Sequence, residues 1–583
     1  MRLVVIDTGF DKNMVDEYEN FCKINGITIR KEQDNFVYLN DYNDTIGHGT
    51  IVCSVLNTYL TQKIELFIIK VFDKKLQCDV DLLIEALNYC CFKIKCDAIQ
   101  ISLGTLYTNQ ALLEIINKIA SKGILIISAF DNEKCLSYPA AYPNVLGVDI
   151  TSQYHKIEDF DIIESNIIDV RGADAFYRTK GLATKKRIVR GSSFYCSYIL
   201  ALIINNENDG NFQKANVLNM LKSHAKCVYK IGNLNYKKLK EVSKAIVFPI
   251  NKETNSIAAF ERLIPFEIVD YFDIRQSGKV NKIVKNLLGY SENDKIIKNI
   301  QNLNWEDNFD TVICGHVGEV SSILGKDILE EISQKCLKYD KILWCFDNGS
   351  HIARKYPELD IRYPIMSRDV LPQYRFGKLR SPGIPIVGVF GTSARQGKMT
   401  IQLYLREAFK NRGFKIKNIG SEPESPLFGF EFSYVFGYGS TDLLNPQEMI
   451  LTLNEAVFEL EKENCDLIVA GSQSGTVAYQ LKNLDMIPLK QYYFLLGVQP
   501  DSIILCINGY DSIEYVRRTI LFFEATVKAK VICLCVSYIN NKGYRMEMHP
   551  LEYFDKNLNV PVFDLMNLHI DDMVHVIQEF YAR

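Results

Sequence analysis

Short apolar runs alternate with amphipathic segments along the first part of the chain. Runs of this kind, bounded by polar residues, are typical of buried strands. They are Leu3–Ile6, Glu65–Val71, Ala98–Ser102, Gly123–Ser128 and Val145–Asp149. Between them, Val80–Cys91 and Asn109–Ser121 carry apolar residues at helical spacing. This alternation predicts an α/β domain in which a parallel sheet is covered by helices on both faces.

The pattern breaks twice further along, and the breaks predict domain boundaries. Residues 233–255 are rich in Lys and Asn, and two prolines interrupt Arg380–Pro385. Strand candidates lie between the breaks at Thr311–Cys314 and Lys341–Phe346, and another, Ile386–Phe390, follows the second break. The expected organisation is a first domain over residues 1–232, a linker over 233–255, a small middle α/β domain over 256–380 and a third α/β domain over 381–583.

The composition is that of an ordinary soluble globular protein, with 47% hydrophobic and 23% charged residues. A net charge of -3 creates no global field that would recruit nucleic acid or an anionic membrane, so neither is expected as a partner. The N-terminus enters a strand at once without a signal-peptide pattern, and no apolar run approaches the roughly 18–20 residues that cross a bilayer. We therefore expect a cytoplasmic protein.

Three short motifs bring candidate catalytic residues into one order along the first domain. They are Asp7–Gly9 at the end of the first strand candidate, Gly47–Thr50 before an apolar helix, and Gly191–Ser193 before another helix. The order Asp7, His48, Ser193 is that of subtilisin, whereas chymotrypsin and the α/β-hydrolases order their triads differently. The chain therefore resembles the subtilisin-like serine proteases, or subtilases.

This resemblance implies a role for each residue of the candidate site. Asp7 would orient His48, His48 would act as general base, and Ser193 would be the nucleophile. The family also supplies an oxyanion donor from an Asn after a buried strand, and Asn132 stands at the matching point. The segment expected to pair with the substrate backbone is Ser102, Leu103 and Gly104, which resembles the family's Ser-Leu-Gly strand. Tyr138–Pro143 resembles its Tyr-Pro-Ala segment.

The sequence also departs from the family pattern beside the nucleophile. Phe194 and Tyr195 replace the usual Met-Ala, and Phe130 with Asp131 replaces small residues before Asn132. Two interpretations stay open. Either the bulky residues narrow the specificity of an active protease, or they crowd the subsites of a catalytically degenerate module that only binds peptide.

A second candidate site opens the third domain, where a glycine-rich turn joins a strand to a helix. Its residues are Gly391, Thr392, Ser393, Ala394, Arg395, Gln396, Gly397, Lys398, Met399 and Thr400. Such a turn directs backbone N–H groups at a phosphate, and a lysine in the position of Lys398 reaches the terminal phosphates. The spacing resembles that of dethiobiotin-synthetase-like P-loop proteins, which implies ATP or GTP with magnesium as cofactor. Met399 replaces the usual magnesium-binding hydroxyl, so Thr400 is the candidate metal ligand; a turn that merely caps a helix is the alternative.

Two later segments extend this second resemblance. Gly471–Gly475 follows an apolar strand candidate, and Gly497–Asp501 precedes another. Their order resembles a bacterial P-loop family of largely unassigned function. We expect a cytosolic serine endopeptidase fused to an NTP-binding module, with a precursor peptide as partner, its leader being removed during maturation. The alternative is a degenerate peptide-binding module whose P-loop domain acts as a nucleotide switch or group-transfer enzyme. The sequence leaves the oligomeric state open.

Overall fold

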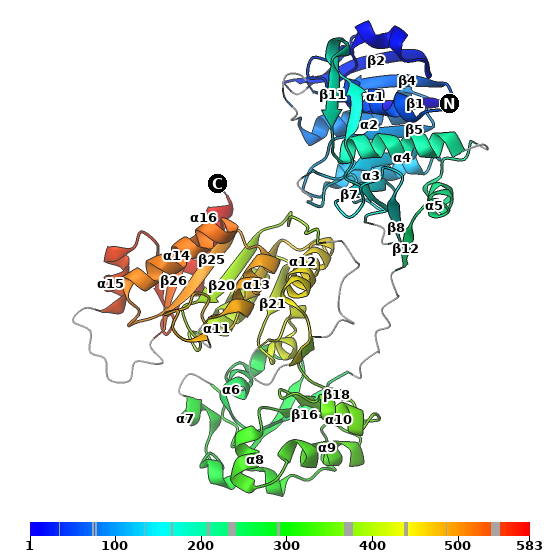
Figure 1. Cartoon of the computed structure of the whole chain (residues 1–583). Helices are drawn as coiled ribbons and strands as arrows, with labels where there is room; N and C mark the ends of the chain where they lie inside the picture. Colours follow the sequence, from blue (N-terminus) through cyan, green and yellow to red (C-terminus); the bar gives the residue numbers. More distant parts are fainter. Residues whose placement is uncertain are drawn as a thin grey trace. The chain divides into compact units, whose positions relative to one another are not determined.

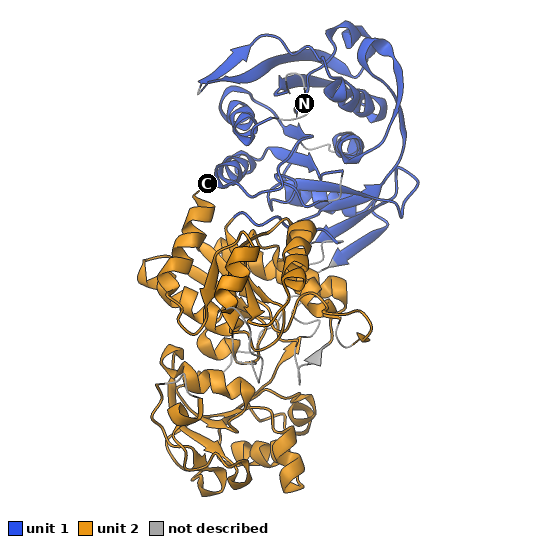
Figure 2. Ribbon diagram, turned by 90° about the vertical axis from the view of Figure 1, so that its left-hand side faces the viewer, with its two compact units in different colours: residues 1–233, 373–383 blue, residues 234–372, 384–583 orange. Residues whose placement is uncertain are grey.

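A computed structural model describes residues 1–582 except 34, 73–74, 76–77, 133–134, 165–166, 207–209, 231–240, 289–291, 367–376, 437–440, 485–486 and 538–548 (Figure 1). The chain divides into two compact units. The first comprises residues 1–233 with 373–383, and the second comprises residues 234–372 with 384–583 (Figure 2). Within the described residues, none of the helices is both long and apolar enough to cross a membrane.

The first unit is built on a ten-stranded sheet, as far as the chain is described. Its strands, in spatial order, are β12 (Cys227–Lys230), β8 (Phe160–Glu164), β9 (Val170–Ala173), β7 (Leu146–Thr151), β6 (Leu125–Ala129), β5 (Ala98–Ile101), β1 (Arg2–Asp7), β4 (Ile64–Lys70), β2 (Phe21–Glu32) and β3 (Asn35–Leu39). Neighbouring strands pair in parallel except β2 with β3 and β8 with β9. A separate hairpin joins β10 (Tyr177–Lys180) to β11 (Lys186–Val189).

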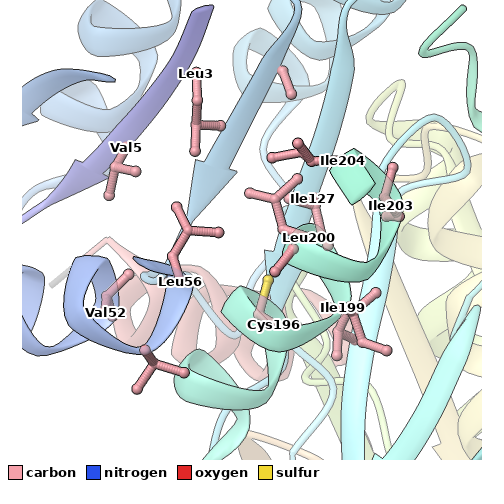
Figure 3. Packing of buried hydrophobic residues seen from close by; sticks show 14 of the residues in the cluster. Leu3, Val5, Val52, Leu56, Ile127, Cys196, Ile199, Leu200, Ile203 and Ile204 are labelled. Atoms are coloured by element: carbon pink, nitrogen blue, oxygen red, sulfur yellow. The ribbon is translucent and has the colours of Figure 1, made fainter. Parts of the chain in front are cut away.

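Helices cover both faces of this sheet. The buried side chains of α1 (His48–Tyr59), α4 (Ser192–Asn206) and α5 (Lys214–Lys222) join one core cluster. Those of α2 (Val80–Lys93) and α3 (Gln110–Ala120) join the other. Figure 3 shows side chains of α1 and α4 packed with those of β1 and β6. The expected parallel sheet with helices on both faces is confirmed.

Two parallel sheets make up the second unit. The six-stranded sheet has the order β15 (Lys298–Asn299), β14 (Glu267–Asp273), β13 (Lys244–Phe248), β16 (Thr311–Cys314), β17 (Ile342–Cys345) and β18 (Ile361–Arg362). The helices of this part are α6 (Lys252–Ala259), α7 (Val284–Leu288), α8 (Gly318–Leu324), α9 (Ile328–Lys338) and α10 (Ser350–Lys355).

The seven-stranded sheet carries the glycine-rich turn. Its order is β22 (Phe432–Ser433), β21 (Ile416–Gly420), β24 (Leu467–Gly471), β20 (Ile386–Gly391), β25 (Ser502–Asn508), β26 (Lys530–Ser537) and β27 (Val562–Asp564). Its helices are α11 (Lys398–Asn411), α12 (Pro446–Lys462), α13 (Leu489–Val498), α14 (Ile513–Val527), α15 (Pro550–Asn557) and α16 (Ile570–Tyr581). A short pair, β19 (Ile365–Met366) with β23 (Thr441–Asp442), completes the strands.

The units differ from the expected domain limits in three respects. Residues 233–240 of the expected linker lie outside the described residues, but its remainder contains β13, a buried strand whose apolar run is short and begins after a lysine. Leu403 and Phe428 share a core cluster with Ile257 and Ile313, so the two sheets of the second unit share one core. Residues 377–383, expected at the end of the middle domain and the start of the third, belong with the first unit.

Candidate active site

The candidate acid and base meet where β1 ends and α1 begins. Asp7 is the last residue of β1 and is fully buried, and His48 is the first residue of α1. His48 Nδ1 lies 2.8 Å from Asp7 Oδ1 and 3.0 Å from Oδ2. Burial lowers the pKa of His48, but the charge of Asp7 and this hydrogen bond outweigh burial and leave the pKa raised. With Nδ1–H donated to Asp7, Nε2 is the nitrogen left to accept a proton.

Asp44 holds the loop that presents His48, a role that the sequence reasoning missed. Its carboxylate accepts hydrogen bonds from the backbone N–H groups of Ile46, Gly47 and Thr50, at 2.7 to 3.0 Å. It also accepts one from Thr8 Oγ1 (3.1 Å) beside Asp7. A buried carboxylate at a helix N-terminus satisfies free N–H groups and favours the helix dipole. An Asp four residues before the histidine, at the start of a loop, was the available signal.

The candidate nucleophile and oxyanion donor lie at the start of α4. Asn132 Oδ1 accepts hydrogen bonds from Ser192 N (2.9 Å) and Ser192 Oγ (3.0 Å), which fixes the amide. Gly191 has a φ of +143° and a Cβ there would lie 2.9 Å from Asn132 Oδ1, so the turn requires glycine. Ser193 is 7% exposed. Within the described residues its Oγ forms no hydrogen bond, either with His48 or with another residue. The contact with His48 is made by the next residue, Phe194, whose ring lies 5.5 Å from the imidazole.

The bulky residues that distinguish this site from the family pattern point into the cores. Phe194 and Tyr195 are buried in the cluster beneath α1 and α4, where Tyr195 OH donates to Ile157 O (3.1 Å). Phe130 is buried in the cluster on the other face of the sheet. Their volume is therefore accommodated mainly by packing inside the unit.

The expected substrate segment continues from the end of β5. Within the described part of the chain, the backbone groups of Ser102, Leu103 and Gly104 form no hydrogen bond. The next residue, Thr105, exchanges two backbone hydrogen bonds of 2.8 Å with Tyr138. An extended segment with free N–H and C=O groups can pair with a peptide by strand addition.

The glycine-rich turn of the second unit lies between β20 and α11, as expected. Lys398 is buried and its Nζ donates to Ser393 O (2.7 Å). The Gln396 side chain folds into the turn, accepting from Ser393 N (2.9 Å) and donating to Thr392 Oγ1 (2.6 Å). Gly391 lies under these groups, because a Cβ there would meet Gln396 Oε1 at 2.6 Å. Some polar groups of the turn therefore already form hydrogen bonds within the turn.

The two residues after Lys398 have different surroundings, one in the core and one partly exposed. Met399 packs against the core cluster that joins the two sheets of the second unit. Thr400 is partly exposed, and its hydroxyl forms no hydrogen bond with any described residue. Among the described residues there is no group of three or more His, Cys, Asp or Glu side chains that could hold a metal ion. A magnesium ion here would therefore depend on nucleotide phosphates and water for most of its ligands. Ala394 and Arg395 are exposed at the tip of the turn, and Gly397, with a φ of +80°, precedes α11.

A buried group of charges lies beside Lys398 and was not expected from the sequence. Burial raises the pKa of Glu422, although the charges of Lys252 and Lys398 oppose this. Glu424 is 4% exposed; its Oε1 accepts from Ser256 Oγ (3.1 Å), whereas its Oε2 has no hydrogen-bond partner among the described residues. These residues come from α6 and from the loop after β21, so both sheets of the second unit contribute to them.

Comparison with known proteins gives matches at both ends of the chain. Residues 2–230 match the Subtilase family, and residues 376–574 match a domain of unknown function described as the DUF1611_C P-loop domain. The minor extracellular protease Epr of Bacillus subtilis (strain 168) is 27% identical over 171 residues, which cover 27% of this chain and 25% of that protein. The match thus spans about a quarter of the length of that relative.

Solved structures show similarity to the same two families. A DUF1611 family protein from Anabaena variabilis is 14% identical with a TM-score of 0.44, covering 58% of this chain and 100% of that one. A cold-adapted subtilisin-like serine proteinase is 15% identical with a TM-score of 0.31, covering 40% of this chain and 89% of that one. By its family matches, the chain carries a subtilase domain at its N-terminus and a DUF1611-type P-loop domain at its C-terminus.

Proposed function

We propose that the first unit is a serine endopeptidase of subtilisin type. The observation that supports this most directly is the Asp7–His48 hydrogen bond at the start of α1, with Asn132 fixed by Ser192 beside the candidate nucleophile. Burying the Asp7 charge is costly unless it is paired, and the hydrogen bond to His48 supplies this pairing in the arrangement that a Ser-His-Asp triad uses.

The proposed reaction uses these residues in two steps. Ser193 Oγ attacks the peptide carbonyl carbon while His48 Nε2 takes its proton, and Asp7 stabilises the imidazolium. Asn132 Nδ2 and the backbone N–H of Ser193 donate hydrogen bonds to the oxyanion. The C–N bond then breaks, and His48 returns the proton to the leaving amine. Water repeats the sequence on the acyl-enzyme, which frees the acid product and Ser193.

The proposed substrate is a dedicated precursor peptide in the cytosol, bound in extended form along Ser102–Gly104. The free backbone groups of this segment support extended binding. The fusion to a P-loop domain supports a processing role, in which a leader is removed from a ribosomally made peptide, over general protein breakdown. We expect Phe194, whose ring lies 5.5 Å from the His48 imidazole, to influence the preference for particular side chains more than Phe130 and Tyr195, which are buried in the cores.

The test is the Ser193→Ala variant, compared with Ser152→Ala, which removes an exposed hydroxyl from a turn. Each protein is incubated with a fluorophosphonate probe and, separately, with candidate precursor peptides read by intact mass. We expect wild type and Ser152→Ala to be labelled and to cleave, and Ser193→Ala to do neither, with a loss of about 10⁶-fold as measured for subtilisin. Labelling that persists in Ser193→Ala would contradict the assignment.

We propose further that Gly391–Thr400 binds ATP or GTP with magnesium, with Lys398 on the terminal phosphates and Thr400 on the metal ion. The strand–turn–helix setting and the buried Lys398 support phosphate binding. Bound there, the nucleotide would supply either a switch signal or a transferable group. The buried Glu424, next to Glu422, favours the second candidate function, transfer of a group to the peptide, because its unpartnered carboxylate oxygen can accept a hydrogen bond from a bound polar group.

One experiment separates a switch from a transferase. The Ser193→Ala protein, which does not cleave, is incubated with precursor peptide, magnesium and ATP, and the peptide mass is measured. A mass gain that disappears in a Ser193→Ala, Glu424→Gln protein would support group transfer. An unchanged peptide, together with a nucleotide-dependent cleavage rate in wild type, would support a switch.

A further inference from the structure

A short segment that follows the six-stranded sheet in the sequence is part of the first unit. Residues 377–383, here called the strap, immediately precede β20 yet belong with residues 1–233. Lys378 is 2% exposed, and its Nζ lies 3.3 Å from Asp149 Oδ1. The same Nζ donates to Cys135 O (3.4 Å) and lies 5.2 Å from the centre of the Phe130 ring.

A second cation of the strap reaches the other side of the same region. Arg380 is 8% exposed, and its Nη1 donates to Tyr138 OH (2.6 Å). Tyr138 in turn pairs through its backbone with Thr105, directly after the expected substrate segment Ser102–Gly104. Arg380 is therefore linked to that segment through Tyr138 and Thr105.

The two contacts converge on the loop that carries Asn132. This loop begins at Phe130, under Lys378, and ends at Tyr138, under Arg380. Asp131 N donates to Ser137 Oγ (3.0 Å) and Phe130 N donates to Val148 O (2.9 Å), so these bonds hold the described residues at the two ends of this segment. Burying a cation costs free energy unless it is paired or hydrogen-bonded; Lys378 is paired with Asp149, and Arg380 donates a hydrogen bond to Tyr138 OH.

We propose that the strap is a working part of the peptidase, and that Lys378 and Arg380 are positioning residues for the oxyanion donor Asn132 and for the substrate segment. Lys378 neutralises buried Asp149 and fixes the Phe130 end of the loop. Arg380 fixes the Tyr138 end. Peptide hydrolysis then depends on residues that lie at the start of the P-loop family match, and residues 1–233 alone lack part of the peptidase. This inference rests on the proposed peptidase function.

The test uses full-length Lys378→Met and Arg380→Met proteins, with Lys338→Met as the matched control because Lys338 is an exposed lysine on α9. The rate constant of fluorophosphonate labelling at Ser193 is measured at a temperature where circular dichroism shows every variant folded. We expect labelling to slow by about 10- to 100-fold in both strap variants, because a misplacement of about 1 Å costs up to about 10²-fold. Lys378→Arg, which keeps the charge, should restore most of the rate.

A second readout does not depend on catalysis. Amide hydrogen exchange in residues 130–138 should become faster in Lys378→Met and Arg380→Met than in wild type and Lys338→Met. Wild-type labelling and wild-type exchange in both strap variants would overturn the inference. If Lys378→Met does not fold, Arg380→Met decides. If wild type is never labelled, the proposed peptidase function fails. The proposed role of the strap fails separately if hydrogen exchange in residues 130–138 is unchanged in the strap variants.

Discussion

The two candidate sites of this chain share a local geometry but differ in the hydrogen bonds that their key side chains already form. In each, the key side chain is the first residue of a helix that follows a glycine with a positive φ: His48 after Gly47 on α1 and Lys398 after Gly397 on α11. His48 is already bonded to its partner Asp7, and Asn132 to Ser192. Lys398 is instead bonded to a carbonyl of its own turn. In the first site the candidate acid and base are thus already paired, whereas in the second the candidate phosphate-binding lysine is bonded within its own turn.

Among changes at Asp7, Asn132 and Lys398, the change at Asp7 should have the largest effect. Asp7→Asn keeps the shape but removes the charge that stabilises the His48 imidazolium, and the same change in chymotrypsin-type enzymes costs about 10⁴-fold in kcat. We expect a loss of similar size in peptide cleavage, measured by initial rates. Asp16→Asn, at an exposed acid of the same unit, should keep the wild-type rate. A comparable loss in both variants would show that the effect is not specific to the site.

Removing the oxyanion donor should have a smaller effect. Asn132→Ala eliminates one side-chain donor to the developing negative charge, a loss of about 10²- to 10³-fold in kcat for the equivalent change in subtilisin. The expected signature is a lower kcat with little change in KM, because the donor acts mainly in the transition state. A change in KM alone would mean that Asn132 binds substrate and not the oxyanion.

Removing Lys398 from the glycine-rich turn should have a smaller effect than either change in the first site. A hydrogen bond to a charged group contributes about 1.5–3 kcal/mol, so Lys398→Ala should weaken ATP or GTP binding by about 10- to 100-fold. Titration calorimetry with magnesium present measures this. Lys410→Ala, an exposed lysine further along α11, is the control and should bind as wild type does. Equal affinities in wild type and Lys398→Ala would place any nucleotide elsewhere.

The smallest expected effect is on the pH dependence of the cleavage rate. His48 must be neutral to accept the Ser193 proton, and its pKa is raised above the ordinary value of 6.5 because Asp7 outweighs burial. The rate should therefore fall as pH drops through a midpoint above 6.5. In Asp7→Asn the residual rate should fall at a lower pH, because burial then acts without the opposing charge. A wild-type midpoint below 6.5 would contradict the raised pKa.

The sequence predicted local features of both sites better than their surroundings. Apolar runs such as Leu3–Ile6 identified the strands, and the motif order placed Asp7 and His48, which the structure brings into contact. Burial of β13 could not be predicted, because a short run beside lysines reads as a linker. The roles of Asp44, Glu424 and Lys378 depend on partners distant along the chain or on burial. Periodicity does not carry that information.

The strap also limits where this chain can be divided into separately stable parts. A break anywhere between residues 233 and 373 would separate Asp149 from Lys378 and Tyr138 from Arg380, leaving a buried carboxylate without its cation. A shortened protein that ends near residue 233 should therefore be less stable than the length of its sheet suggests, since an unpaired buried charge costs about 3–5 kcal/mol.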